Sequence, residues 1–143
     1  MAMRDNEQSH DGGCLCGAVR FRVSGPPAWV AHCHCQSCRR ASGAAFLTWA
    51  GYTGETWRLT AGDPVRFESS PGAWRRFCPA CGTPLTYEGA YCPGEIHVTI
   101  GSLDEPGDFT PSSHVFTEEQ IAWLHIADDL PRHAKLGRDS EAD

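Results

Sequence analysis

Apolar and polar residues alternate in short runs along this chain, and the runs have the length of β-strands. Val19, Phe21 and Val23 occupy every second position of residues 18–23, which predicts a half-buried strand ending at the Gly-Pro-Pro turn of residues 25–27. Residues 95–100 alternate in the same way. The remaining predicted strands lie between glycine and proline turn signals, at residues 29–34, 44–50, 56–60, 65–68, 74–77, 85–87 and 113–116.

Helix plays a small part in this pattern. One short helical turn is expected over residues 36–41, ending near Gly43. Fifteen Gly, ten Pro and five Trp beside only two Met favour a turn-rich β protein over a helical bundle. The predicted fold class is therefore mainly β, with little helix.

The ends of the chain are polar and charged, with little to bury. Residues 1–11 are expected to form a disordered N-terminal tail and residues 134–143 a polar C-terminal tail. Residues 12–133 are predicted to form a single domain, since a chain of 143 residues is long enough to bury an ordinary core.

Composition also indicates which classes of partner the protein does not bind. A net charge of −6 argues against nucleic acid, because phosphate binding needs clustered Lys and Arg, and the basic doublets are Arg39-Arg40 and Arg75-Arg76. No apolar run approaches the roughly 18 residues of a membrane span, and the start lacks the pattern of a secretory signal. We therefore expect a cytoplasmic protein with no nucleic-acid or membrane partner.

Seven of the eight cysteines fall into three close groups: Cys14-x-Cys16, Cys33-x-Cys35-x-x-Cys38 and Cys78-x-x-Cys81. A reducing compartment disfavours disulfides, so close pairs there are metal ligands or redox groups. A secreted disulfide framework, which the even total would allow, fits the absent signal poorly. The grouping divides the thiols into four plus three.

The segment Cys78-Pro79-Ala80-Cys81-Gly82 has the character of a zinc knuckle, in which a tight turn aims two sulfurs at one point. A redox Cys-x-x-Cys favours a site where a strand meets a helix, whereas strand-like sequence flanks this one on both sides. A knuckle supplies two ligands, and Cys14 and Cys16 can supply the other two. The four thiolates together predict a closed structural zinc site.

The middle group, Cys33, Cys35 and Cys38, yields three ligands and leaves a fourth position open, as in catalytic zinc sites. His32, His34 and Cys92 could complete it. In a strand, however, the two histidines point away from the face that carries Cys33 and Cys35, which favours second-shell or core roles for them. Cys92 has the character of a small packing residue.

Several motifs together resemble the glutathione-dependent formaldehyde-activating enzymes, which share a domain with centromere protein V. The resemblance runs from about Gly12 to His133. The matching segments are Gly12-Gly13-Cys14-Leu15-Cys16-Gly17, Cys33-His34-Cys35-x-x-Cys38-Arg39-Arg40-x-x-Gly43-Ala44, Phe77-Cys78-Pro79-x-Cys81-Gly82-Thr83-Pro84-Leu85, Gly101-Ser102-Leu103-Asp104, His114-Val115-Phe116, Trp123-Leu124 and Asp129-Leu130-Pro131.

This resemblance implies a small zinc-stabilised β domain of the Mss4-like, or β-tent, kind, with two zinc ions per chain. The first and last cysteine pairs would hold the structural zinc, and the triplet a second zinc at which a thiol substrate acts. The implied activity is that of a carbon–sulfur lyase of the S-(hydroxymethyl)glutathione synthase type. Its partners would be glutathione, or another small thiol, and formaldehyde.

A mechanism follows as a hypothesis. Zinc would hold the substrate thiol as a thiolate beside the aldehyde, and His34 or His32 would supply the proton that the product oxygen needs. Arg39 and Arg40 could pair with a substrate carboxylate, with Arg75 and Arg76 as weaker candidates. The five tryptophans are interpreted as core or cavity wall.

Two other functions are compatible with the same residues. One is a zinc-stabilised structural or interaction module, in which a fourth protein ligand closes the second site. The other is a thiol carrier that acts on a different aldehyde adduct. A fourth ligand on the triplet would favour the module, and an open position would favour the enzyme.

Overall fold

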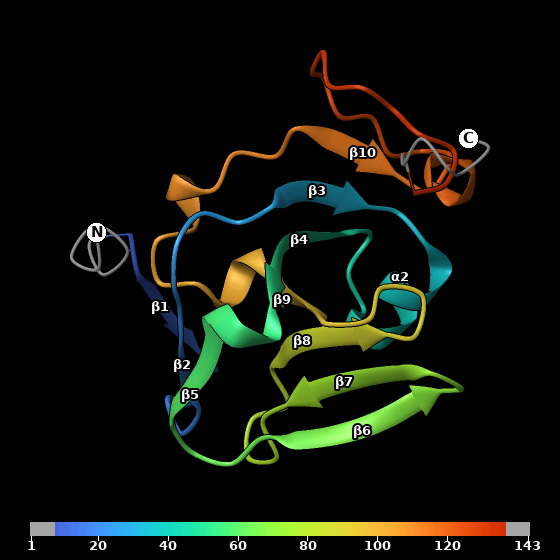
Figure 1. Cartoon of the computed structure of the whole chain (residues 1–143). Helices are drawn as coiled ribbons and strands as arrows, with labels where there is room; N and C mark the ends of the chain where they lie inside the picture. The colour runs from blue at the N-terminus through green and yellow to red at the C-terminus, as the bar shows by residue number, and fades with distance from the viewer. Residues whose placement is uncertain (1–7, 137–143) are drawn as a thin grey trace.

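The computed structural model of the protein describes residues 8–136. It contains a seven-stranded sheet in the order β10-β3-β4-β9-β8-β7-β6 and a three-stranded sheet in the order β1-β2-β5 (Figure 1). The strands are β1 (His10–Gly13), β2 (Arg20–Val23), β3 (Trp29–Cys33), β4 (Leu47–Thr53), β5 (Trp57–Ala61), β6 (Val65–Ser70), β7 (Ala73–Phe77), β8 (Pro84–Gly89), β9 (Glu95–Thr99) and β10 (Ser113–Val115).

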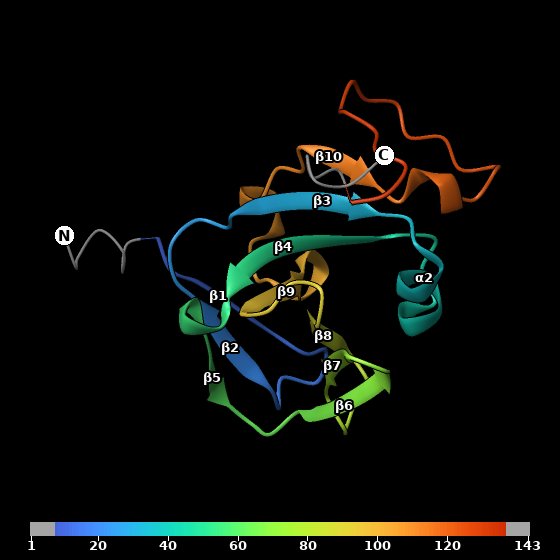
Figure 2. The ribbon, with the colours of Figure 1, turned by 45° about the vertical axis from the view of Figure 1, so that its right-hand side comes forward.

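Helical structure is confined to short elements: α2 (Gln36–Ser42) and the 3₁₀ turns η1 (Gly54–Thr56), η2 (Ile100–Ser102), η3 (Pro106–Asp108) and η4 (Thr117–Glu119). In both views the small sheet lies on one side of the molecule and α2 on the other (Figures 1 and 2). The prediction of a mainly β fold with little helix is confirmed. No helix within residues 8–136 is long and apolar enough to cross a membrane.

Strand β2 shows how the alternating pattern builds the core. Phe21 and Val23 are fully buried, and burying such a side chain stabilises the fold by about 1.5–3 kcal/mol. On the other face, Arg22 donates to Asp11 at 2.7 Å, with both side chains about 40% exposed. The same core takes buried side chains from the large sheet and the loops, among them Val30, Ala50, Tyr52, Leu85, Ile96, Val98, Leu103 and Phe109.

Strand β9 is buried on both faces, whereas alternation predicted burial on one. It lies inside the large sheet, between β4 and β8. Ile96 and Val98 enter the main core, while His97 packs its ring edge-on against Trp29, at 4.6 Å between centroids. Two faces of the sheet are therefore covered here, and the second face carries the candidate site.

Gly51 makes this second face possible. It lies opposite Trp29 in the β3–β4 register, and a β-carbon at this position would overlap the Trp29 ring. The absence of a side chain makes room beside β4 for the indole, which forms one wall of the site.

Residues of both expected tails take part in the fold. The expected N-terminal tail of residues 1–11 includes the start of β1, where His10 and Asp11 pair with Val23 and Arg22. In the expected C-terminal tail of residues 134–143, the carbonyl of Lys135 accepts a backbone hydrogen bond from Phe116 at 2.8 Å. Residues 1–7 and 137–143 lie outside the described residues.

The predicted strand at 44–50 is displaced to β4, Leu47–Thr53, because β4 begins only where Leu47 pairs with Cys33. The alternation of residues 95–100 also extends one residue too far, since Ile100 turns into η2.

Candidate metal centres and the adjoining cavity

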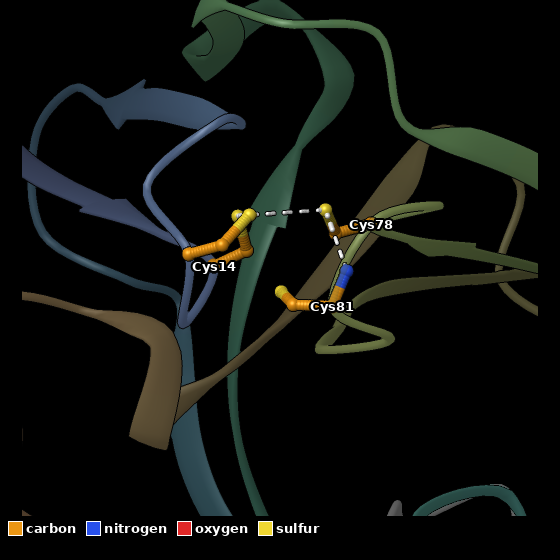
Figure 3. Close-up of side chains that lie close together, drawn as sticks. Cys14, Cys78 and Cys81 are labelled. Carbon is orange, nitrogen blue, oxygen red and sulfur yellow. Dashed lines mark hydrogen bonds between the residues drawn. The ribbon is translucent and has the colours of Figure 1, made fainter.

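The four cysteines predicted to form one site converge from two loops that are distant in sequence. Their sulfurs all lie within 4.8 Å of one another, and those of Cys14 and Cys78 come from separate loops (Figure 3). The Cys14–Cys16 and Cys16–Cys78 sulfur pairs are 3.6 and 3.8 Å apart. Tetrahedral zinc with Zn–S bonds of about 2.3 Å separates its sulfurs by roughly 3.8 Å, so this quartet fits the ion closely.

Backbone geometry holds the quartet in place. Gly82 has a φ of 82°, and its N–H donates to the Cys78 carbonyl at 2.8 Å, which folds the chain back under the two sulfurs. The Cys78 sulfur accepts from the N–H groups of Ala80 and Cys81 at 3.3 and 3.4 Å. Such N–H···S bonds stabilise the thiolate form of a sulfur, and the thiolate is the form that binds a metal ion.

Thr83 joins the two loops. Its hydroxyl accepts from the Leu15 N–H at 3.0 Å and lies 3.2 Å from the Cys81 sulfur. The hydrogen bond from Thr83 helps to lower the pKa of the Cys81 thiol to about 5. This thiol is therefore available as a thiolate at neutral pH.

The three remaining grouped cysteines also converge. Cys38 lies 3.1 Å from Cys35 and 3.4 Å from Cys33, sulfur to sulfur, and these distances exceed a disulfide bond of about 2.05 Å. Cys35 is the N-cap of α2, so the predicted helical turn is the element that returns Cys38 to the other two. The indole N–H of Trp49 donates to the Cys38 sulfur at 3.4 Å.

Crowding of the three sulfurs shifts their ionisation. Contact with Cys33 lowers the pKa of the Cys35 thiol to about 3, while contact with Cys35 and then Cys38 raises the pKa of Cys33. One thiolate is stabilised by neighbours that remain protonated, because several buried negative charges repel one another. A divalent cation would remove this conflict by compensating all three charges, so the donor set fits a metal.

A cavity of about 430 Å³ opens directly beside the triplet. This volume lies in the range of small-molecule sites. Its walls are mostly aromatic and apolar, with Arg75, His97 and Glu119 among the ionisable residues. The lining residues include Cys33, Cys35, Cys38, Trp29, Trp49, Tyr87, Tyr91, Val115, Phe116 and Leu136.

Arg75 is the arginine that lines this cavity, whereas the sequence favoured Arg39 and Arg40 as the residues that pair with a substrate carboxylate. The Arg75 guanidinium lies 4.9 Å from the Tyr87 ring centroid, and its Nε donates to Ser69 at 3.1 Å. Arg39 and Arg40 line a separate, shallower depression with Trp123. Being next to Cys38 in the sequence does not place Arg39 and Arg40 in the cavity, because α2 turns the residues after Cys38 away from it.

His34 does not line the cavity either, which argues against its predicted role as proton donor. It is fully buried on the other side of β3, where its Nε2 lies 3.0 Å from Nδ1 of His114. His114 in turn lies 2.9 Å from Asp128 through its Nε2. His32 lies beside them, with its Nδ1 2.7 Å from the Thr48 hydroxyl. Burial lowers the pKa of His34 to about 4, so this imidazole is neutral at pH 7.

His97 is the cavity histidine, and the sequence reasoning did not single it out. It is 5% exposed, and its Nε2 lies 2.9 Å from the Glu95 carboxylate and 3.9 Å from the Cys92 sulfur. Cys92 thus groups with His97 and Glu95 and is not part of the triplet cluster. The sequence offers one signal for it, a histidine within the alternating strand of residues 95–100.

The tryptophans divide between the predicted roles. Trp29 and Trp49 are cavity walls, and Trp57 packs against the main core. Arg66 lies 4.5 Å from the ring centroid of Trp74. Trp123 departs from the prediction, since it is 70% exposed beside Arg39 and Arg40.

Comparisons with known proteins agree with this architecture. The profile of the glutathione-dependent formaldehyde-activating enzyme family matches residues 9–119. A Halomonas elongata protein that carries the name of this family is 28% identical over 126 residues, which cover 81% of this chain and 80% of that protein. A crystal structure of a Rhodobacter sphaeroides protein matches with a TM-score of 0.55 and 27% identity, over 66% of this chain and 87% of that chain. The chain belongs to the glutathione-dependent formaldehyde-activating enzyme family.

Proposed function

We propose that this protein condenses formaldehyde with glutathione, or a similar small thiol, to an S-hydroxymethyl adduct. In this reaction the thiolate sulfur attacks the carbonyl carbon, a C–S bond forms, the C–O π bond breaks and the oxygen takes up a proton. The observation that carries the proposal is the triplet of sulfurs in the wall of a cavity. Within residues 8–136, no fourth histidine, cysteine or carboxylate joins the cluster of Cys33, Cys35 and Cys38.

We further propose zinc for both cysteine clusters, two ions per chain. Cys14, Cys16, Cys78 and Cys81 would close one ion and hold the fold, while Cys33, Cys35 and Cys38 would hold the other with one position facing the cavity. Zinc at the triplet would supply the charge that keeps a substrate thiol deprotonated at neutral pH. All eight cysteines are free thiols, which favours work in a reducing compartment such as the cytoplasm.

The chain's own residues would bind and orient the thiol. Trp29, Trp49 and Tyr87 line the cavity and would exclude water from the aldehyde carbon beside the sulfur. Arg75 would pair with a substrate carboxylate. His97, held by Glu95, and the Tyr87 hydroxyl are among the cavity groups able to deliver a proton to the product oxygen.

The activity is tested by following the consumption of formaldehyde and glutathione against the spontaneous reaction at the same pH. We expect acceleration by the zinc-loaded protein that scales with its concentration. Cysteine and 2-mercaptoethanol in place of glutathione would define the thiol class. Acceleration with none of these thiols, in protein with both cysteine sites loaded, would favour the structural module.

Replacing Arg75 by glutamine should raise the KM for glutathione about 10- to 100-fold and leave kcat nearly unchanged, because a charged hydrogen bond to a carboxylate is worth about 1.5–3 kcal/mol. Arg40→Gln is the matched control, since Arg40 lies outside the cavity. With 2-mercaptoethanol, which has no carboxylate, wild type and Arg75→Gln should be indistinguishable. An equal effect on both thiols would contradict the assignment of Arg75.

A further inference from the structure

A separate group of ligand side chains lies on the face of β3 away from the cavity. His32, His114 and Asp128 each offer one ligand atom, and these atoms lie within 4.8 Å of one another. None of the three lines the cavity or belongs to either cysteine cluster. They come from three segments: His32 from β3, His114 from β10, and Asp128 from the chain after η4.

Strand register explains why the two histidines meet. His114 lies opposite His32 in the parallel β10–β3 pair, and Thr48 lies opposite His32 in β4. Side chains directly opposite across paired strands project from the same face. The His32 and His114 rings are therefore neighbours, with centroids 4.8 Å apart.

Each candidate ligand also has a hydrogen-bond partner outside the cluster. His32 is held through Nδ1 by Thr48 at 2.7 Å, and His114 through Nδ1 by His34 at 3.0 Å. Asp128 accepts the Leu130 N–H through Oδ1 at 3.1 Å. Histidine ligands in metal sites are oriented by this kind of second bond. Nε2 of His114 and Oδ2 of Asp128 lie 2.9 Å apart and hydrogen-bond each other, and a metal ion shared with His32 would take the place of that hydrogen bond.

His34 gives independent support for an oriented ligand group around His114. It is fully buried, and its Nδ1 has no hydrogen-bond partner among the described residues. A buried polar atom without a partner costs about 1–3 kcal/mol. An apolar residue would avoid that cost, so the imidazole is explained by its contact with His114, which fixes the orientation of the His114 ring.

We propose that His32, His114 and Asp128 form a third metal site, which binds a divalent transition ion such as Zn²⁺ or Co²⁺. Two imidazole nitrogens and one carboxylate oxygen are ligands for ions of this borderline class. The ion would connect β3 and β10 to the C-terminal segment, which contributes Leu136 to the cavity wall. With three protein ligands and no thiolate, this site binds more weakly than the cysteine sites and exchanges its ion more readily.

The test is a titration of Co²⁺ into the desalted protein whose cysteine sites already hold zinc. We expect one equivalent to bind, with visible d–d absorption and without the intense near-ultraviolet band of cobalt–thiolate bonds. The zinc content should stay at two ions per chain. Absence of binding would overturn the proposal, and so would a thiolate band, because it would report exchange into a cysteine site.

Asp128→Asn is the decisive variant, since an amide keeps the shape and can still accept from Leu130. Loss of an orienting partner alone costs 10–100-fold in metal affinity, so loss of a ligand should weaken Co²⁺ binding by more than about 100-fold. Asp129→Asn is the matched control, one residue away and exposed, and should bind Co²⁺ as the wild type does.

His32→Gln provides a second variant should Asp128→Asn alter the fold, and the circular dichroism spectrum reports that fold. His32→Gln should also weaken Co²⁺ binding by more than about 100-fold, by the same loss of one ligand. Unchanged affinity in a folded Asp128→Asn or His32→Gln protein would reduce the cluster to a hydrogen-bonded network.

Discussion

Cys81→Ser should leave a chain that does not fold to a soluble native state. The four-sulfur site joins the loop after β1 to the turn between β7 and β8, which no strand pairing connects directly. Structural zinc contributes an apparent ~10–16 kcal/mol in small peptides, whereas whole domains are stable by about 5–15 kcal/mol. Loss of one ligand from a closed site therefore removes a contribution comparable to the entire stability.

The measurement combines metal content with circular dichroism of the protein recovered from the soluble and insoluble fractions. Cys92→Ser is the matched control, because Cys92 is also buried but belongs to neither proposed zinc site. The control should remain folded with two zinc ions. A soluble, folded Cys81→Ser protein with both ions would refute the structural role of the quartet.

Cys38→Ser should give the opposite pattern: a folded protein that has lost one zinc ion and accelerates the reaction no more than the spontaneous background. The triplet lies within one short segment, from the end of β3 to the first turn of α2, so it adds no long-range connection to the fold. A serine hydroxyl can still accept the Trp49 N–H, which avoids leaving that buried donor without a partner.

Zinc content and thiol-dependent formaldehyde consumption, measured on the same preparation, test this second result. Cys92→Ser again serves as the control, since it lies near the cavity and should keep both zinc and activity. Full activity of a Cys38→Ser protein with one zinc ion would separate the triplet from catalysis. Unfolding of Cys38→Ser to the same extent as Cys81→Ser would remove the division between structural and catalytic ions.

The local parts of the candidate site were predictable from the sequence. The spacing of Cys35 and Cys38 is one turn of helix, and the structure forms that turn as α2 with Cys35 at its N-cap. Likewise Gly82, just after Cys81, takes the positive φ that the knuckle needs. Backbone geometry over three to five residues determines such features, so they can be read before the fold is known.

The cavity was less predictable. Arg39 and Arg40 were favoured because they follow Cys38, yet the direction of α2 carries them away, and β7 brings Arg75 to the cavity instead. His34 and His32 are the predicted proton donors, yet neither lines the cavity, because both lie on the face of β3 to which strand alternation already assigned them. His97 was passed over because its importance depends on the burial of β9 between two strands.

The sequence by itself determined the strand-rich fold, the grouping of seven cysteines and the family, because each depends on residue types and short spacings. Only the tertiary structure decided which charged and aromatic side chains face the triplet, and that His32, His114 and Asp128 meet. Those neighbours are separated by up to about a hundred residues, and strand register and sheet order bring them together. A shift of one residue in that register would turn the same side chains to the opposite face of the sheet.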